Sequence, residues 1–159
     1  MKIKIICLGK LKEKYLKDGI DEYIKRIKRF ANVEIIELSD ERIPDNASDA
    51  ECNRIVELEG EKILSKITPN EYVISLCIEG KLVSSEELAK KMSDIMISGN
   101  SCITFLIGAS LGLSDKVKQK SDFRLSFSKM TFPHQLMRLI LCEQIYRTFK
   151  INGNEQYHK

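Results

Sequence analysis

The stretch Cys102-Ile103-Thr104-Phe105-Leu106-Ile107-Gly108-Ala109-Ser110-Leu111-Gly112 decides the fold class of this chain. Its first six residues are almost entirely apolar, which is typical of a strand that is buried on both faces of a sheet. Strands of this kind occur in parallel sheets that are covered by helices on both sides. The glycine-rich second half predicts a tight loop that leads from the strand into the next helix.

Outward from this stretch, strand-like runs alternate with amphipathic helical runs along the whole chain. The pattern predicts strands at residues 2–8, 33–38, 72–78, 102–107 and 123–127. It predicts helices at residues 13–30, 48–67, 84–98, 114–120 and 133–151. This alternation indicates an α/β fold with a mainly parallel sheet. No linker or repeat divides the sequence, so we expect a single domain over residues 1–159.

Local signals mark several ends of these elements. Two helices begin with a capping box, in which a serine accepts from the amide three residues on and a glutamate reaches back. These are Ser48-Asp49-Ala50-Glu51 and Ser84-Ser85-Glu86-Glu87. Residues 79–81, Glu-Gly-Lys, predict a turn after the third strand. The last helix is apolar nearly all round, which predicts burial against the sheet or against a second subunit.

The composition is that of an ordinary folded protein, with 43% hydrophobic and 31% charged residues in a chain of 159. No apolar run approaches the ~20 residues that cross a bilayer, and the apolar start is too short for a secretion signal. We therefore expect a cytoplasmic protein. Five cysteines without a Cys-x-x-Cys pair predict reduced thiols, buried at Cys7, Cys77 and Cys102. No group of His, Cys, Asp and Glu has metal-site spacing, so we expect no metal.

The net charge of +3 is modest, but it is distributed unevenly along the chain. Residues 1–30 carry a balance of +6, residues 31–100 one of −8, and residues 101–159 one of +5. If the two ends of the chain lie together in the fold, they form a basic face that can hold phosphates. The alternative is that these charges only keep helix surfaces solvated.

In α/β folds with a parallel sheet, ligands bind beyond the carboxyl ends of the strands. The loops at that edge begin at Gly9, Ser39, Glu79, Gly108 and Ser128. The loop 108–112 lacks both the Gly-x-Gly-x-x-Gly of dinucleotide folds and the Gly-Lys-Ser/Thr of a P-loop. Its two glycines allow the close approach of a flat ligand, and they suit a tight turn equally well.

The C-terminal region holds the remaining candidates. The connector 126–134 mixes large apolar side chains with hydroxyls, so its apolar groups need cover from the protein or from a ligand. His134 is expected to stay neutral, because the dipole at a helix start disfavours its protonated form. Arg138 and Arg147, on a mostly apolar helix, indicate either ion pairs or a bound anion. The final residues 157–159, Tyr-His-Lys, are either a frayed end or a group that stacks on a base and meets its phosphate.

These residues closely resemble the C-terminal signature of the RlmH family. The signature comprises Leu125-Ser126-Phe127-Ser128-Lys129-Met130-Thr131-Phe132-Pro133-His134-Gln135, Arg138, Glu143-Gln144-Ile145-Tyr146-Arg147, Ile151, Gly153 and Tyr157-His158-Lys159. The opening Gly9-Lys10-Leu11-Lys12 also looks like that family, so the resemblance covers essentially the whole chain. Its members are SPOUT-class methyltransferases that act on N3 of a pseudouridine in 23S ribosomal RNA. The resemblance implies an α/β SPOUT fold with a C-terminal trefoil knot, a homodimer, and S-adenosylmethionine as methyl donor.

The resemblance also implies roles for particular residues. The cofactor contacts carry over to Leu76, Gly108, Phe127, Ser128, Lys129, Met130, Thr131 and Phe132. For catalysis we expect Tyr157 to stack on the target base and His158 to act as base or hydrogen-bond partner. Arg138 or Arg147 would hold a phosphate or enolate oxygen. The expected substrate is the ribosome or its large subunit, with phosphate contacts from the basic segments 1–30 and 101–159. The short tail is expected to cross to the cofactor pocket of a partner chain.

Two departures from the family pattern stand out. Ala109 replaces a second glycine, which suits cofactor binding only if its φ is negative. Gln156 replaces a frequent proline before the terminal Tyr-His. Two competing hypotheses stay open: a ribosome-associated RNA-binding protein of the same fold that has lost its chemistry, and a flavodoxin-like nucleotide or flavin binder that uses the loop 108–112.

Overall fold

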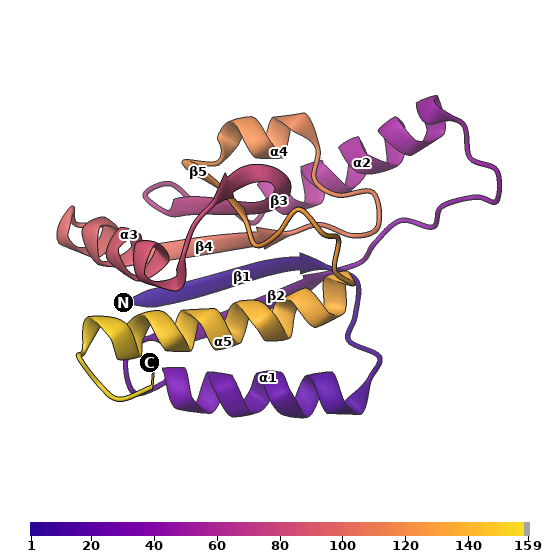
Figure 1. Cartoon of the computed structure of the whole chain (residues 1–159). Helices are drawn as coiled ribbons and strands as arrows, with labels where there is room; N and C mark the ends of the chain where they lie inside the picture. Colours follow the sequence, from indigo (N-terminus) through magenta and orange to yellow (C-terminus); the bar gives the residue numbers. More distant parts are fainter. Residues whose placement is uncertain (158–159) are drawn as a thin grey trace.

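The fold is a five-stranded parallel sheet between two layers of helices (Figure 1). The computed structural model describes residues 1–157 of the chain. The strands are β1 Lys2–Leu8, β2 Asn32–Leu38, β3 Tyr72–Leu82, β4 Cys102–Ile107 and β5 Phe123–Ser126. The helices are α1 Lys14–Ile27, α2 Asp49–Leu64, α3 Ser85–Ile97, α4 Asp115–Lys120 and α5 His134–Asn152. The strand order is β2-β1-β4-β3-β5.

The predicted α/β class, parallel sheet and alternation of elements are confirmed. Both predicted capping boxes are present. Ser48 Oγ accepts from the backbone N–H of Glu51, and Ser84 Oγ accepts from that of Glu87, each over 3.2 Å. Each glutamate in turn accepts from the N–H of its serine. The trefoil knot stays a prediction.

The turn predicted at residues 79–81 is wrong. β3 continues to Leu82, because its last two residues pair again with β5 after a bulge. Gly80 lies within that bulge, where a Cβ would come within 2.8 Å of the backbone of Arg124 on β5. Only glycine lets the two strands approach this closely. Bulges next to a strand end redirect side chains, and this one turns residues 77–79 toward the cavity described below.

Two apolar cores lie on opposite faces of the sheet. Helices α1, α3 and α5 cover one face, and α2 and α4 cover the other (Figure 1). Successive side chains of a strand point to opposite faces of the sheet. Ile5 packs in the same core as Ile145 of α5, and Ile6 packs in the same core as Ile63 of α2. Burial on both faces explains why the strands are apolar throughout.

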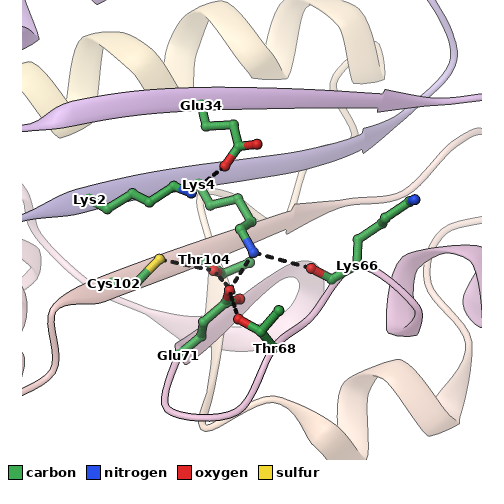
Figure 2. Close-up of polar contacts among 8 residues, drawn as sticks. All are labelled: Lys2, Lys4, Glu34, Lys66, Thr68, Glu71, Cys102 and Thr104. Carbon is green, nitrogen blue, oxygen red and sulfur yellow. Dashed lines mark hydrogen bonds and ion pairs between the residues drawn. The ribbon is translucent and has the colours of Figure 1, made fainter.

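A buried polar network joins the amino-terminal halves of two strands (Figure 2). Lys4 on β1 forms an ion pair with Glu71 and donates to the carbonyl of Lys66 over 3.1 Å. Glu71 also accepts from Thr104 of β4 over 2.8 Å and from Thr68 over 2.5 Å. Because a buried charge without a partner is costly, this network holds β1, β4 and the segment before β3 in one arrangement.

The two basic ends of the chain lie together, as a shared basic face requires. Helix α1 packs along α5 in the same layer (Figure 1). Aromatic side chains join them: Tyr23 faces Tyr146 with ring centroids 6.2 Å apart, and Phe30, just after α1, stacks on Phe149 at 5.3 Å. The first and last segments of the sequence therefore contribute to one surface.

Candidate active site

A cavity of about 380 Å³ opens at the carboxyl ends of β3, β4 and β5. Its walls are the end of β3, the loop 108–113 after β4, and the connector between β5 and α5. The position agrees with the rule that parallel sheets bind ligands beyond the carboxyl ends of their strands. The volume lies within the range of small-molecule sites.

Most of the predicted cofactor residues lie together in the wall of this cavity. These are Leu76, Gly108, Phe127, Ser128, Met130, Thr131 and Phe132. Lys129 belongs to the same connector, but it is exposed and does not line the cavity. The fold thus brings together two candidate regions that are far apart in the sequence, the loop after β4 and the connector after β5.

The loop after β4 is a tight turn on which one wall of the cavity is built. The N–H of Gly112 donates to the carbonyl of Ala109 over 2.9 Å, and Gly112 has a φ of +79°. A Cβ on Gly108 would lie 2.6 Å from the carbonyl carbon of Gly112, so that position accepts only glycine. Ala109 is not among the described residues with positive φ, which meets the condition placed on this departure from the family pattern.

The connector between β5 and α5 is held by its own hydroxyl groups. Ser126 Oγ donates to the carbonyl of Ser128 over 3.1 Å, and Ser128 Oγ accepts from the N–H of Met130 over 3.0 Å. Met130 and Phe132 are nevertheless 73% and 36% exposed. Large apolar side chains in such a position lack cover within one chain, which is typical of a binding surface.

The sequence alone did not point to two charged groups in the cavity, Glu79 and Lys118. They line it from the β3 bulge and from α4, and they form an ion pair with each other. The hydrogen bond from Lys118 lowers the pKa of Glu79 below its usual value. Cys77 also lines the cavity and is only half-buried, contrary to the predicted burial of this thiol. Glu79 and Cys77 lie at the predicted end of the third strand, which is a sequence signal for this edge of the sheet, whereas Lys118 lies inside a helix and has no such signal.

His134 opens α5 and lines the cavity on the side of β1. Burial lowers its pKa, and the nearby guanidinium of Arg138 lowers it further, while Asp40 opposes the shift. The imidazole is therefore neutral at neutral pH, as expected. A neutral imidazole in a cavity wall can accept or donate a hydrogen bond.

Arg138 lies one helical turn further along α5 and is fully buried. Its Nη1 pairs with Glu37 of β2 over 2.6 Å, and its Nη2 donates to the carbonyls of Leu8 and Gly9 over 3.1 and 2.6 Å. Of the two interpretations of this residue, the geometry favours the ion pair over a bound anion. Nη1 and Nη2 are bound to protein groups, whereas Nε has no hydrogen-bond partner among the described residues, so the contact of Arg138 with a substrate oxygen stays a prediction.

The tail after α5 folds back, so that Tyr157 packs against the middle of this helix and does not line the cavity. Its hydroxyl donates to Glu143 over 3.2 Å, and its ring lies edge-on to that of Tyr146 with centroids 4.8 Å apart. The guanidinium of Arg147, which also pairs with Glu143 over 2.6 Å, sits 4.8 Å from the Tyr157 ring. The predicted catalytic residue His158 lies outside the described residues.

No described helix combines the length and apolar character that crossing a membrane requires. Within residues 1–157, no three His, Cys, Asp or Glu side chains come together as metal ligands. All five cysteines are described, and their thiols are free.

The chain is similar to known proteins over its whole length. A family described as "Predicted SPOUT methyltransferase" matches residues 1–158. A Clostridioides difficile protein named ribosomal RNA large subunit methyltransferase H is 60% identical over the full length of both chains. A Streptococcus uberis protein of the same name is 59% identical, again over both full lengths. Among solved structures, a probable methylase family protein from Haemophilus influenzae matches 99% of this chain and 70% of its own, with a TM-score of 0.52 and 12% identity, which bears on the fold alone.

Proposed function

The chain belongs to the SPOUT methyltransferase family, in its RlmH group, and we propose that it methylates N3 of a pseudouridine in 23S ribosomal RNA. The methyl donor would be S-adenosylmethionine. The observation that carries this proposal is the full-length identity of 60% to a protein named for methylation of large-subunit ribosomal RNA. The cavity at the strand ends supplies a place where the reaction can occur.

The groups in the cavity wall fit S-adenosylmethionine. Apolar side chains such as Leu76 and Phe132 suit an adenine ring, and the ion pair of Glu79 and Lys118 offers an acceptor and a donor for polar groups of the ligand. When bound, S-adenosylmethionine supplies an electrophilic methyl carbon on a positively charged sulfur. The backbone of the turn at Gly108 would hold the ligand in a fixed place, and Met130 and Phe132 would exclude water.

The chain has to accept the imide proton of the target base, because the neutral nitrogen is a poor nucleophile. His158 stays the predicted acceptor. The neutral imidazole of His134 is a second candidate, since it already lines the cavity. For Arg138 we now propose an indirect role, because its guanidinium is bound to protein groups.

The position of Tyr157 supports the proposal of a homodimer. α5 has 19 residues and begins at the cavity with His134. The partner of Tyr157 on this helix, Glu143, lies nine residues after His134, which is about 13.5 Å along the helix axis. The two residues after Tyr157 span at most about 7 Å, so we propose that the tail acts on the cavity of a second copy, with Tyr157 as its anchor on α5.

The proposed substrate is the assembled large subunit or ribosome. The chain carries a net charge of only +3, which is modest for a tight grip on naked RNA. Recognition over the wider surface of two subunits needs less charge and would use the shape of folded RNA.

Methyl transfer tests the proposal directly. The chain is incubated with methyl-tritiated S-adenosylmethionine and large subunits from cells that lack this activity. We expect label in 23S RNA, and mass spectrometry of nuclease digests should place the methyl group on a pseudouridine. Calorimetry in parallel measures binding of S-adenosylmethionine. Binding without transfer to any subunit or ribosome would favour the non-catalytic RNA-binding hypothesis, and binding of flavin in its place would favour the flavodoxin-like one.

A further inference from the structure

The short loop between β1 and α1, residues 9–13, carries two exposed lysines, Lys10 and Lys12. It begins where β1 ends, at Gly9, whose φ of +82° turns the chain sharply. A Cβ placed on Gly9 would lie 3.6 Å from Nε2 of His134, a residue of the cavity wall. The loop therefore begins beside the cavity wall, next to His134.

The backbone of this loop is held by side chains from other elements. Nη2 of Arg138 donates to the carbonyls of Leu8 and Gly9. The N–H of Leu11 donates to Glu37 of β2 over 3.0 Å, and Glu37 is also the ion-pair partner of Arg138. The N–H of Lys12 donates to the side chain of Gln135 in the first turn of α5 over 3.0 Å.

This arrangement separates the role of the backbone from that of the two lysines. The contacts use main-chain groups only, so the ammonium groups of Lys10 and Lys12 are left to solvent. Three carboxylates lie in or beside this loop. Glu37 is paired with Arg138, so the two lysines have to offset the charges of Glu13 and Asp40 toward an approaching anion. Met130 and Phe132 are exposed in the wall of the cavity, where a base of the RNA could stack on them.

We infer that Lys10 and Lys12 form a phosphate clamp for the RNA backbone next to the target nucleotide, and that Arg138 is the positioning residue that holds their loop at the cavity. This inference rests on the proposed function and narrows it, because it assigns substrate contact to one loop. Arg138 then acts on the reaction through the loop, without touching RNA. A rigid loop loses little conformational entropy when it binds, which favours affinity.

The test compares two double variants in the methyl-transfer assay with unmethylated large subunits. Lys10→Ala with Lys12→Ala should raise KM for the subunit about tenfold at moderate salt, because two phosphate contacts are lost. We expect kcat to change less than twofold and the affinity for S-adenosylmethionine to stay the same. The slope of log KM against log salt should fall by about 1.4–1.8, as expected for two phosphates.

The matched control removes the same charge elsewhere. Lys66 and Lys120 are exposed. Lys66 lies just after α2 and Lys120 is the last residue of α4, so both are at the edge of the sheet where the strands begin, opposite to the cavity. Lys66→Ala with Lys120→Ala should leave KM and its salt slope unchanged. Equal KM values and slopes for the two double variants, with an active wild type, would overturn this inference alone. An inactive wild type that binds S-adenosylmethionine would instead refute the proposed function.

The positioning role of Arg138 needs its own readout. Arg138→Lys keeps the charge but not the fork that reaches two carbonyls and Glu37, so KM should rise while kcat falls less. Gln135→Ala removes only the acceptor for the N–H of Lys12 and serves if the arginine variant does not fold. A lower melting temperature with unchanged KM and salt slope in both variants would show that the residues are merely structural.

Discussion

At the residue scale, Gly108 and Ala109 are neighbours with opposite tolerance for substitution. A Cβ on Gly108 meets the backbone of Gly112 at 2.6 Å, and that turn cannot yield without moving the cavity wall. Overpacking of this kind costs about 1–3 kcal/mol. Gly108→Ala should therefore weaken binding of S-adenosylmethionine about tenfold or more, as measured by calorimetry.

Ala109→Gly is the matched control for this change. Because Ala109 has no positive φ, the turn does not require glycine there, and binding should stay within about threefold of the wild type. A Gly108→Ala chain that binds as tightly as the wild type would show that the loop after β4 is not part of the cofactor site.

Cys77 offers a second test at the residue scale, because it is the cysteine that lines the cavity. Burial raises the pKa of the thiols of Cys7 and Cys142 to about 11 and about 12, whereas Cys77 and Cys52 are only half-buried. Iodoacetamide at pH 8 should therefore modify Cys77 and Cys52 first. Burial also raises the pKa of Cys77, so its labelling should accelerate as the pH rises.

S-adenosylhomocysteine at saturation should protect Cys77 and leave the labelling of Cys52 unchanged. Peptide mass spectrometry measures both sites in one sample, so Cys52 is an internal control. Undiminished labelling of Cys77 with the ligand bound would place the ligand elsewhere.

At the scale of elements, the network around Glu71 joins β1 to β4. Burial alone would raise the pKa of this carboxyl, but hydrogen bonds from Lys4, Thr68 and Thr104 together lower it. A carboxyl whose pKa is lower in the folded state stabilises the fold above its unfolded pKa, and this contribution is lost as the pH falls through the folded pKa. Part of the acid sensitivity of the fold should therefore originate in this network.

Thr104→Val removes one donor from the network without changing the size of the side chain. The free energy of unfolding at pH 7 should fall by about 1–3 kcal/mol, because a hydrogen bond to a charged group is lost. The folded pKa of Glu71 should rise, so the loss of stability in acid should begin at a higher pH. Urea titrations at several pH values measure both effects. Thr68→Val, at an exposed donor, should have a smaller effect, and the reverse order would contradict this account.

Elements that depend on neighbouring residues could be predicted from the sequence, and those that depend on distant ones could not. The capping boxes at Ser48 and Ser84 were predictable because all their partners lie within three residues. The bulge in β3 depends on β5, which lies more than 40 residues further along, so Glu-Gly-Lys read as a turn. The cavity followed from the rule for parallel sheets, but the pairing of Arg138 with Glu37 joins residues 101 apart.

At the scale of the whole molecule, α5 separates the cavity from the anchor of the tail. His134 lies at the cavity, whereas the tail leaves the far end of the helix and folds back, so that Tyr157 is anchored at mid-helix by Glu143 and Arg147. If residues 157–159 take part in methyl transfer, the tail of each chain does not reach the cavity of the same chain, so each cavity needs the tail of another chain. A symmetric dimer solves this for both chains at once, because each tail can serve the cavity of its partner.

Mixing two inactive variants tests this arrangement. One carries Gly108→Ala, which damages the cavity, and the other ends at residue 156, which removes the tail. Each alone should be inactive in methyl transfer. Co-refolded in equal amounts, half of the dimers contain both chains, and each of these has one intact site, so activity should return to about a quarter of the wild type. Mixed dimers with no activity would mean that each chain uses its own tail, provided that both variants bind one another and keep the wild-type circular dichroism spectrum.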